Sequence, residues 1–429
     1  MSAREHDRPS QSPRRLFLLG ATGSIGTSAL DVIRDFERRG VRRFEVVGLA
    51  SARNGQALAQ RAREFGVRAV AVADSSAEIV APGLDTAKLE VLRGPRAACE
   101  LLERHARPGD LVLAAMVGAA GIEPVLSAIA RGCDVALANK ETLVAAGAIV
   151  MPAASAAGVR IIPVDSEHNA LFQCLKASVA ASVAASSAAS SAASTAASPA
   201  AAMREVRRVV LTASGGPFRR KSREEIAAAT VDDALAHPMW RMGQKVTVDS
   251  ASLMNKALEL IEAHWLFGLE SSRIDAIVHP QSIVHGFVEY VDGSVLAQLS
   301  PPDMRTPIQQ ALCDPERLDG PSRKLDFAAL RSLDFEPVDT ERFPAILLAH
   351  RVIDAGGTSG AAFNAANEVA VEAFLARRIP FPAITDIVRE VLDDEPVRPV
   401  RALADVLAAD AEARLRARRA VERLALAPT

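Results

Sequence analysis

Two carboxylates, two residues apart, follow a short apolar segment in the middle of the chain. The segment Ile161–Val164 is apolar and short, as expected of a buried strand, and Asp165, Ser166 and Glu167 come directly after it. Side chains at positions i and i+2 of an extended chain point to the same side, so Asp165 and Glu167 would converge. Converging carboxylates repel each other unless a cation or a shared proton lies between them. The spacing favours a site for a hard divalent metal, although two solvated acids at a strand end would explain it about equally well.

A glycine-rich turn near the start of the chain has the features of a nucleotide site. The apolar run Leu16–Leu19 leads into the segment Gly20–Gly26, spaced G-x-x-G-x-x-G, and an amphipathic helical pattern follows. Glycines in such a turn let the backbone approach a pyrophosphate, and the free N–H groups of a helix N-terminus attract an anion. This context of strand, turn and helix predicts a dinucleotide-binding domain.

The residues after the next predicted strand bear on the choice of cofactor. The run Phe44–Ala50 is followed by Ser51, Ala52, Arg53 and Asn54. Enzymes that use NAD commonly place an acid here, which binds the ribose 2′-hydroxyl. Arg53 would instead attract a 2′-phosphate, so we expect NADP rather than NAD. The alternative is that Arg53 is an ordinary surface charge.

Further apolar runs alternate with helical patterns: Ala69–Val72, Leu111–Ala114 and Val135–Ala138. This alternation predicts a mostly parallel, doubly wound sheet. Ligands of such sheets bind at the carboxyl ends of the strands. Asn139, Lys140 and Glu141, which follow the last run, should therefore face the cofactor or the substrate. A structural ion pair is the alternative role for Lys140.

The second half of the chain carries more polar groups in patterns that suit ligands. The turn Thr212–Phe218 is rich in hydroxyls and glycine and suits a phosphate, with an ordinary tight turn as the alternative. In the next long helical pattern, Ser252, Asn255, Lys256 and Glu259 would share a polar patch. The first three can bind an anion and the last can ligate a cation. A solvated helix face is the alternative.

Two other segments of this half have recognisable patterns. His237–Gly243 combines Trp240 and Met242 with a proline and a glycine outside any clear period, which fits either a buried turn or a mobile lid. Ile283–Val291 and Val295–Leu299 flank the pair Asp292-Gly293, which predicts a β-hairpin.

Taken together, these motifs resemble the 1-deoxy-D-xylulose-5-phosphate reductoisomerase family, whose enzymes use NADPH in the non-mevalonate isoprenoid route. The segments that carry the resemblance are, in chain order, GATGSIG, ALANKETLV, PVDSEHNA, LTASGGPF, HPMWRMG, VDSASLMNKALE, HPQSIVH, DGSVLAQLSPPDMRTP and NAANE. They extend from Gly20 to about Ala411, apart from an Ala/Ser-rich insertion. Several long segments in this order make the resemblance specific.

The resemblance implies a role for each motif. The metal ligands would be Asp165, Glu167 and Glu259, holding Mg²⁺ or Mn²⁺, with Co²⁺ also possible. The substrate would be bound by Ser166, Glu167, Ser214, His237, Ser250, Asn255, Lys256 and Glu259, with Lys140, Glu167, His237 and Lys256 catalytic. NADPH would be bound by Thr22, Gly23, Ser24, Ile25, Arg53, Asn54, Asn139, Lys140, Glu141, Gly243 and Met304. Trp240 and Met242 would belong to the lid.

The resemblance also implies the reaction and the assembly. The enzyme would rearrange and reduce 1-deoxy-D-xylulose 5-phosphate to 2-C-methyl-D-erythritol 4-phosphate, with NADPH and a divalent metal, as a homodimer joined through its sheet domain. One rival is a simpler NADP-dependent aldehyde or semialdehyde dehydrogenase, which needs no metal. Another is a catalytically silent NADP-binding regulator.

Composition excludes some classes of function. The chain has 429 residues and a net charge of -2, so a nucleic-acid partner is not expected. The apolar run before Gly20 is too short for a signal peptide, and the stretch Leu111–Ile122 is too short to cross a membrane. The four cysteines are scattered and predict reduced thiols. We therefore expect a cytoplasmic protein.

The predicted fold is α/β, with a Rossmann-like dinucleotide-binding domain, a central α/β catalytic domain with a mostly open sheet, and a C-terminal four-helix bundle. The expected divisions are a disordered tail (1–13), the NADPH-binding domain (14–164), the catalytic and dimerisation domain (165–313), a linker (314–340) and the bundle (341–429). Residues 177–202, the Ala/Ser-rich insertion, are expected to form a mobile loop with at most transient helix. We expect an irregular connector from Met304 to about residue 340. The predicted bundle helices are Ala345–Ala355, Gly360–Arg378, Ala383–Leu392 and Arg401–Leu426.

Overall fold

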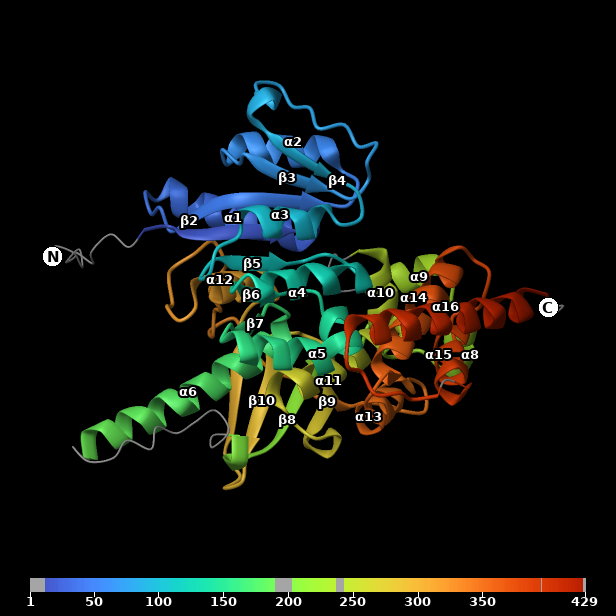
Figure 1. The fold of residues 1–429 in the computed structure, drawn as a ribbon. Helices are drawn as coiled ribbons and strands as arrows, with labels where there is room; N and C mark the ends of the chain where they lie inside the picture. Colours follow the sequence, from blue (N-terminus) through green and yellow to red (C-terminus); the bar gives the residue numbers. More distant parts are fainter. Residues whose placement is uncertain (1–11, 190–202, 237–242, 395, 427–429) are drawn as a thin grey trace.

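The computed structural model describes residues 12–189, 203–236, 243–394 and 396–426 (Figure 1). Its N-terminal part contains a sheet of seven parallel strands in the order β4-β3-β2-β1-β5-β6-β7. The strands are β1 (Arg14–Leu19), β2 (Phe44–Ser51), β3 (Ala69–Val72), β4 (Glu90–Arg93), β5 (Leu111–Ala114), β6 (Asp134–Leu137) and β7 (Ile161–Pro163). The predicted parallel sheet is confirmed. The apolar pattern does not predict the edge strand β4, because charged residues at both its ends leave only two apolar residues between them.

Helices cover both faces of this sheet, as a doubly wound fold requires. They are α1 (Ser24–Arg38), α2 (Gly55–Glu64), α3 (Ala97–His105), α4 (Ile122–Ala130) and α5 (Glu141–Ala157), with short 3₁₀ turns η1 (Thr86–Lys88) and η2 (Ala119–Gly121). Alternate residues of β1 enter different cores: Leu16 and Leu18 pack with α1 and α2, and Phe17 and Leu19 with α3, α4 and α5. Leu16–Leu19 are buried on both faces of the sheet, which is why this part of β1 is a continuous apolar run.

The second sheet is mixed and has the strand order β11-β10-β8-β9-β12. Its strands are β8 (Val206–Ala213), β9 (Ile274–Val278), β10 (Val284–Tyr290), β11 (Val295–Leu299) and β12 (Glu336–Pro337). The helices of this part are α6 (Ser166–Ala189), α8 (Arg223–Ala227), α9 (Val231–Leu235), α10 (Gln244–Ala251) and α11 (Met254–Phe267), with the turn η3 (Ser271–Arg273). The predicted hairpin is confirmed, and Gly293 in its turn has φ +85°.

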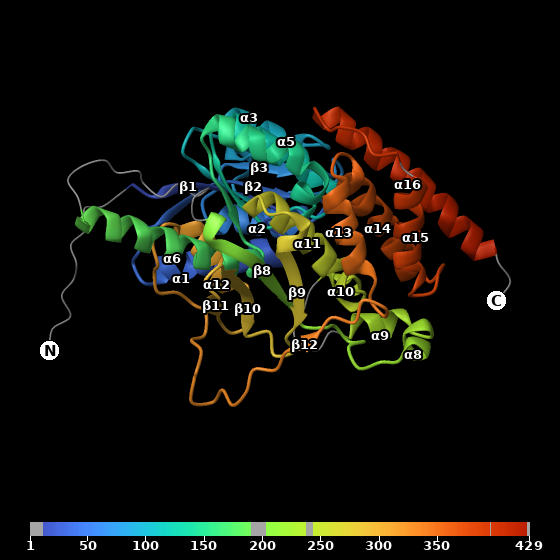
Figure 2. The same cartoon turned by 90° about the horizontal axis from the view of Figure 1, so that it is seen from below.

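The helix α6 corrects the expectation of a loop from residue 177. It continues without a break to Ala189, while residues 190–202 lie outside the described residues. Leu171 and Cys174, in the first part of the helix, are buried in the core. This packing stabilises the first turns of the helix, whose formation is the unfavourable step. The alanines that follow then extend the helix readily. In Figures 1 and 2 the distal end of α6 extends away from both sheets.

The connector also contains a helix that the sequence pattern does not predict. α12 (Arg305–Cys313) begins directly after Met304, so the expectation of irregular structure is wrong for these residues. Pro307 suggests a helix breaker, but it lies in the first turn, where its missing N–H has no helical partner to lose. Ile308 and Leu312 pack in the core beneath α1, so α12 returns the chain to the first domain.

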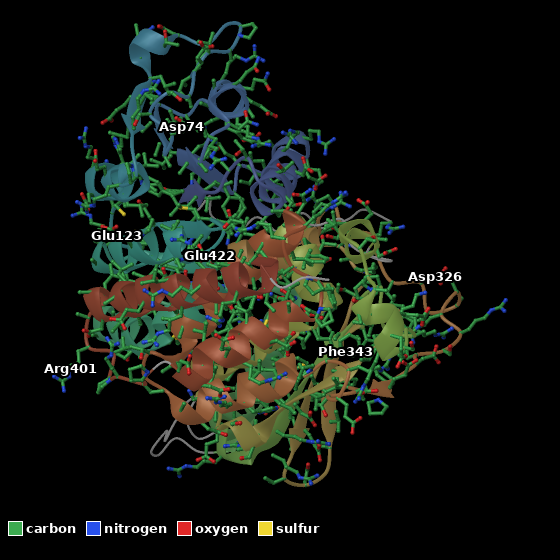
Figure 3. The ribbon with its side chains drawn as sticks, turned by 90° about the vertical axis from the view of Figure 1, so that its right-hand side faces the viewer. Asp74, Glu123, Asp326, Phe343, Arg401 and Glu422 are labelled. Atoms are coloured by element: carbon green, nitrogen blue, oxygen red, sulfur yellow. The ribbon has the colours of Figure 1, made fainter. Side chains whose placement is uncertain are left out.

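The C-terminal part consists of the four predicted helices. They are α13 (Ala345–Ala355), α14 (Ser359–Leu375), α15 (Ala383–Asp394) and α16 (Leu403–Leu426). α14 packs against α15 and α16 and also against α5 of the first domain. Figure 3 shows this side of the molecule, with Arg401 projecting outward before α16 and Asp326 projecting from the connector.

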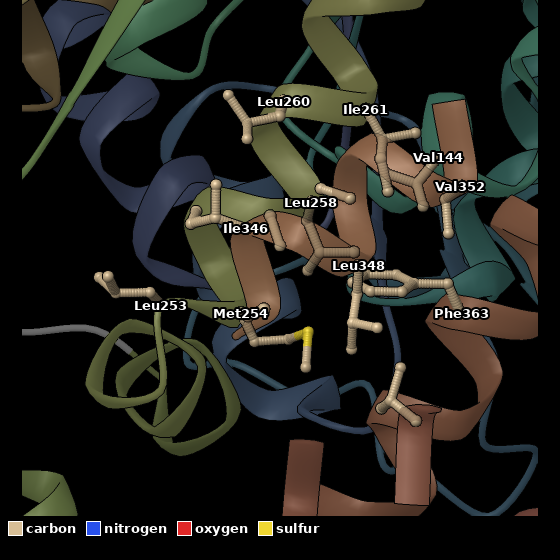
Figure 4. Packing of buried hydrophobic residues seen from close by; sticks show 14 of the residues in the cluster. Val144, Leu253, Met254, Leu258, Leu260, Ile261, Ile346, Leu348, Val352 and Phe363 are labelled. Atoms are coloured by element: carbon tan, nitrogen blue, oxygen red, sulfur yellow. The ribbon is translucent and has the colours of Figure 1, made fainter. Parts of the chain in front are cut away.

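Apolar packing fixes the orientation of α11, the helix with the predicted polar patch. Leu258 and Ile261 are almost fully buried and belong to one core with Leu348, Val352 and Phe363 of α13 and α14 (Figure 4). With this face of α11 held by the bundle, its polar residues are directed to the first domain. In the part of the chain that the structure describes, no helix is long and apolar enough to cross a membrane.

Candidate active site

The site begins where two neighbouring parallel strands end. Leu137 of β6 pairs with Pro163 of β7, so the segments after them leave the sheet side by side. Lys140 follows β6 and Asp165 follows β7, and Lys140 Nζ lies 2.5 Å from Asp165 Oδ2. Lys140 Nζ also donates to Glu259 Oε1 of α11 at 2.9 Å. Lys140 therefore lies at the carboxyl ends of the strands and makes ion pairs there, and its expected contact with the cofactor or the substrate stays a prediction.

Three predicted carboxylates meet at this point. Asp165, Glu167 and Glu259 each offer an oxygen, and these atoms all lie within 4.8 Å of one another. Lys256 Nζ donates to Glu167 Oε1 at 2.8 Å and also contacts Glu259. The convergence of Asp165 and Glu167 has a different origin from the extended geometry expected. Because α6 begins at Ser166, Glu167 lies in the first helical turn.

The charges in this cluster are buried and incompletely balanced. Three carboxylates face two ammonium groups, Lys140 and Lys256. Burial, and then the charge of Glu259, raises the pKa of Glu167 to about 7. Burial alone would raise the pKa of Asp165, but Lys140 and His168 outweigh it and hold that pKa well below its ordinary value. An additional cation would relieve the repulsion, and an all-oxygen donor set suits Mg²⁺ or Mn²⁺. The residues present therefore fit a divalent metal.

A second group of metal-ligand type lies behind the first and shares Asp165 with it. Asp165, His168 and Glu262 offer atoms within 4.8 Å of one another. His168 Nε2 contacts the carbonyl oxygen of Glu259 at 2.8 Å, and Nδ1 lies 3.5 Å from Glu262 Oε2. Burial would lower the pKa of His168, but Glu262 and Asp165 raise it to about 9. Sequence reasoning assigned no role to His168 or Glu262, both of which are fully buried.

A cavity of about 690 Å³ joins the carboxylates to the other predicted motifs. It brings together most of the predicted ligand residues, namely Gly23, Ser24, Ile25, Asn139, Lys140, Glu141, Asp165, Ser166, Glu167, Ser214, Gly243, Ser250, Asn255, Lys256, Glu259 and Met304. His168 and Glu262 are not part of its lining. The three-oxygen cluster is therefore the one that a ligand in the cavity can reach.

The turn after β8 approaches α10 closely enough to require glycine. Ser214 lines the cavity, and its hydroxyl accepts a hydrogen bond from the N–H of Gly216 at 3.3 Å. Gly216 has φ +63°, and a Cβ there would lie 2.7 Å from the carbonyl oxygen of Ser250. The turn and α10 are thus in contact, which brings the hydroxyls of Ser214 and Ser250 to one side of the cavity.

Several predicted residues lie elsewhere. Thr22 is outside the cavity lining and its hydroxyl contacts that of Ser51 at 2.7 Å. Arg53 is exposed after β2, and Asn54 caps α2 by accepting from the N–H of Ala57. Thr22 lies within the first glycine turn, after β1, and Arg53 and Asn54 follow β2, the neighbour of β1 in the sheet.

One predicted residue turns inward, and three others cannot be placed. Ser252 was expected on the polar patch, but it is buried, and its hydroxyl donates to the carbonyl oxygens of Val248 and Asp249 at 3.2 Å. Unlike Asn255, Lys256 and Glu259, Ser252 is absent from the cavity lining, so it does not share their patch. His237, Trp240 and Met242 lie outside the described residues.

The cavity also contains residues for which sequence reasoning proposed no role. Lys245, Asp249, Ser282 and His285 are among its lining. His285 Nε2 lies 2.9 Å from Ser300 Oγ, and burial, together with the nearby charge of Lys256, lowers its pKa to about 4. The only available signal for Lys245 was its i, i+4 spacing from Asp249.

Comparisons with known proteins agree along the length of the chain. Three family models match: "1-deoxy-D-xylulose 5-phosphate reductoisomerase" at residues 16–147, "1-deoxy-D-xylulose 5-phosphate reductoisomerase C-terminal domain" at residues 161–267, and "DXP reductoisomerase C-terminal domain" at residues 299–416. The chain is 47% identical over 414 residues to the 1-deoxy-D-xylulose 5-phosphate reductoisomerase of Paraburkholderia xenovorans, covering 96% of each chain. It is 47% identical over 421 residues to that of Burkholderia multivorans, covering 97% of this chain and 98% of the relative.

Solved structures give the same result. The 1-deoxy-D-xylulose 5-phosphate reductoisomerase from Zymomonas mobilis, in complex with NADPH, is 41% identical, with a TM-score of 0.81 and coverage of 96% of this chain and 100% of that one. A DOX-P reductoisomerase in complex with NADPH, fosmidomycin and magnesium is 37% identical, with a TM-score of 0.85 and coverage of 97% and 100%.

Proposed function

Because the chain belongs to the 1-deoxy-D-xylulose 5-phosphate reductoisomerase family, we propose that its cluster of three carboxylates is the metal site of that enzyme. The protein is an NADPH-dependent oxidoreductase that converts 1-deoxy-D-xylulose 5-phosphate to 2-C-methyl-D-erythritol 4-phosphate with a divalent metal. The observation that carries the site assignment is the meeting of Asp165, Glu167 and Glu259 within 4.8 Å, in the wall of the cavity.

These three residues would hold the metal through carboxylate oxygens. When bound, it supplies Lewis-acid stabilisation for negative charge that develops on substrate oxygens. Lys140 and Lys256 surround the same carboxylates. Burial would lower the pKa of both ammonium groups, but the carboxylates raise both above the ordinary lysine value. The two lysines therefore serve as hydrogen-bond donors rather than as bases, with Lys140 directed at substrate hydroxyls and Lys256 at the substrate phosphate.

The remaining cavity residues divide into two binding regions. Ser214, Ser250, Asn255 and Lys256 present hydroxyl, amide and ammonium donors, which suit the substrate phosphate. The phosphate is not a reacting group, so its binding energy can orient the substrate without taking part in the chemistry.

The second region is the cofactor site. NADPH supplies the hydride for the reduction when it is bound. The turn Gly23–Ile25 would receive the pyrophosphate, and Arg53 with Asn54 the adenosine side. Asn139, Glu141, Gly243 and Met304 would contact the rest of the cofactor, because they line the cavity that also contains that turn and the carboxylates.

The family resemblance supports roles for residues outside the described part of the chain. His237 would contact the substrate, and Trp240 and Met242 would cover it as part of a lid. We also propose the domain divisions 14–164, 165–313, 314–340 and 341–429.

We propose further that the enzyme acts in the cytoplasm as a homodimer joined through its second sheet. The edge strand β11 supports this, since Val295 and Leu296 are 52% and 41% exposed on it. An open edge with exposed apolar side chains is a typical pairing surface. Analytical ultracentrifugation tests the dimer, and a monomer at micromolar concentration would exclude it.

The test of function is the loss of NADPH absorbance with 1-deoxy-D-xylulose 5-phosphate, with and without Mg²⁺, and with NADH as a control. We expect oxidation that requires the metal and prefers NADPH, with the branched product identified by NMR. Metal-independent oxidation would instead indicate a simple dehydrogenase. NADPH binding without oxidation would indicate a silent regulator.

A further inference from the structure

One motif in the sequence takes no part in the site as described above. Asn364, Asn367 and Glu368, from the segment NAANE, lie on α14 in the C-terminal bundle. Both asparagines are fully buried, and neither is among the described residues that line the cavity. Buried amides need hydrogen-bond partners, so the partners of these residues indicate what the motif does.

The partner of Asn367 lies in another part of the fold. Asn367 Nδ2 donates to Asp249 Oδ1 of α10 at 2.9 Å. Asp249 is 1% exposed, and its second oxygen lies 3.2 Å from Nζ of Lys245, one turn earlier in α10. The bundle therefore holds, through one amide, the carboxylate that helps to fix Lys245.

Lys245 continues the connection into the first domain. Its Nζ donates to Glu141 Oε1 at 2.9 Å. Glu141 Oε2 accepts from Asn139 Nδ2 at 2.8 Å, and the same amide donates to the carbonyl oxygen of Gly118 at 3.2 Å. An unbroken series of polar contacts thus runs from α14 through α10 to the start of α5.

The charges in this series of contacts are balanced by one residue, Lys245. Glu141 and Asp249 are both almost fully buried, and Lys245 is the cation that lies between them. Burial would raise the pKa of Glu141, but Lys245 outweighs it and lowers that pKa. A buried carboxylate that loses its cation must move, take up a proton or admit water.

A second contact links α14 to the same region. A Cβ on Gly118 would lie 2.9 Å from Glu368 Oε1, so α14 lies directly against the segment after β5. Glu368 is held by Asn364 at 3.1 Å and by Arg414 of α16. Asn367 and Glu368 are thus directed at elements that border the cofactor region, and Asn364 holds Glu368 from the same helix.

We propose that Asn367, Asp249 and Lys245 are positioning residues through which the C-terminal bundle sets the place of Glu141 and thereby the affinity for NADPH. This inference deepens the proposed function, because it rests on Glu141 as a cofactor contact. None of the three residues contacts Asp165, Glu167 or Glu259 in the described structure, so the metal site is expected to be independent of them.

The test measures the Kd for NADPH by fluorescence in folded variants, without substrate. Lys245→Met removes the charge at similar size and should raise the Kd at least about tenfold, while Lys245→Arg should retain most of the affinity. Asn367→Ala should raise it about threefold to tenfold. The double variant should bind NADPH about as weakly as Lys245→Met alone, because both changes interrupt one series of contacts.

Two controls separate positioning from general loosening. Asp393→Asn breaks an exposed ion pair with Arg351 in the same bundle and should leave the Kd for NADPH unchanged. Mn²⁺ binding, measured by electron paramagnetic resonance, should stay within about twofold of wild type in every variant. An unchanged Kd for NADPH in folded Lys245→Met would overturn the inference, and so would an equal loss of NADPH and Mn²⁺ affinity. Turnover plays no part in this comparison, so a wild-type protein that binds NADPH but fails to reduce the substrate would contradict only the proposed function.

Discussion

Lys140 Nζ and Asp165 Oδ2 lie 2.5 Å apart although 24 residues separate them, since they follow adjacent parallel strands. The sheet topology thus creates an ion pair at the edge where such folds bind ligands. Glu259 of α11 joins the pair from the other side, at 2.9 Å from the same ammonium group. The site therefore depends on two sheets and a helix that the bundle holds in place.

The first prediction concerns Lys256, which lies between Glu167 and Glu259. Lys256→Met leaves the buried Glu167 without its cation and Glu259 with Lys140 alone, which costs about 3–5 kcal/mol of unfolding free energy. Mg²⁺ should restore part of the loss by taking over the neutralisation. Thermal unfolding in EDTA and in Mg²⁺ measures this, with Lys221→Met, which breaks an exposed pair with Glu225, as the control. A loss of Tm that Mg²⁺ leaves unchanged would contradict the prediction.

The second prediction concerns cofactor choice. Arg53 is exposed after β2, where the proposed cofactor site would place the 2′-phosphate that NADPH carries and NADH lacks. Arg53→Ser should lower the ratio of kcat/KM for NADPH to that for NADH by about 10-fold to 100-fold, since one charge-assisted contact is lost. Steady-state kinetics with both cofactors give this ratio. An unchanged preference would show that other residues recognise the phosphate.

The third prediction concerns pH. Burial and the nearby Lys256 lower the pKa of His285 from 6.5 to about 4. As the pH falls below 6.5, the imidazole of His285 takes up a proton in the unfolded chain before it does so in the folded protein. The neutral His285 therefore contributes fully to the free energy of unfolding above pH 6.5. This contribution is lost as the pH falls towards 4, and the loss is on the order of 3 kcal/mol. Urea unfolding of wild type and His285→Gln measures the difference, and an imidazole NMR signal that titrates near pH 6.5 would disprove it.

The fourth prediction concerns the contact between the bundle and the first domain. A Cβ on Gly360 of α14 would lie 2.0 Å from the carbonyl oxygen of Val144 in α5. Replacing a helical glycine by alanine ordinarily stabilises a helix by about 0.5–1 kcal/mol. Here the clash with backbone should prevail, and Gly360→Ala should lower the free energy of unfolding by about 2 kcal/mol or more. Urea titration would reveal the opposite sign if the helices can separate without loss.

Much of the fold is predictable because its signals are local. The run before the glycine turn is buried on both sides and is therefore apolar throughout, and the bundle helices have clear breakers between them. Where prediction fails, tertiary contact decides. Pro307 is harmless only because α12 begins at Arg305, and the alanines after Leu175 remain helical because the start of α6 is docked on the core.

The candidate site, too, is predictable from the sequence only where its signals are local. The spacing of Asp165 and Glu167 is visible locally, but only the resemblance adds Glu259, because α11 reaches the other two through tertiary packing. The role of Lys245 depends on two contacts between residues more than 100 positions apart in the sequence. Lys245 donates to Glu141, and Asn367 donates to Asp249, and no local pattern predicts these pairings.

The most direct measurement compares wild type and Glu259→Gln for Mn²⁺ binding by electron paramagnetic resonance and for NADPH binding by fluorescence in the same preparation. Glu259 contributes one oxygen to the three-carboxylate cluster and makes no contact with the glycine turn of the cofactor site. We predict that Mn²⁺ affinity falls at least about 100-fold while NADPH affinity stays within about twofold. Unchanged Mn²⁺ affinity, or an equal loss of NADPH affinity, would contradict the assignment of the metal site.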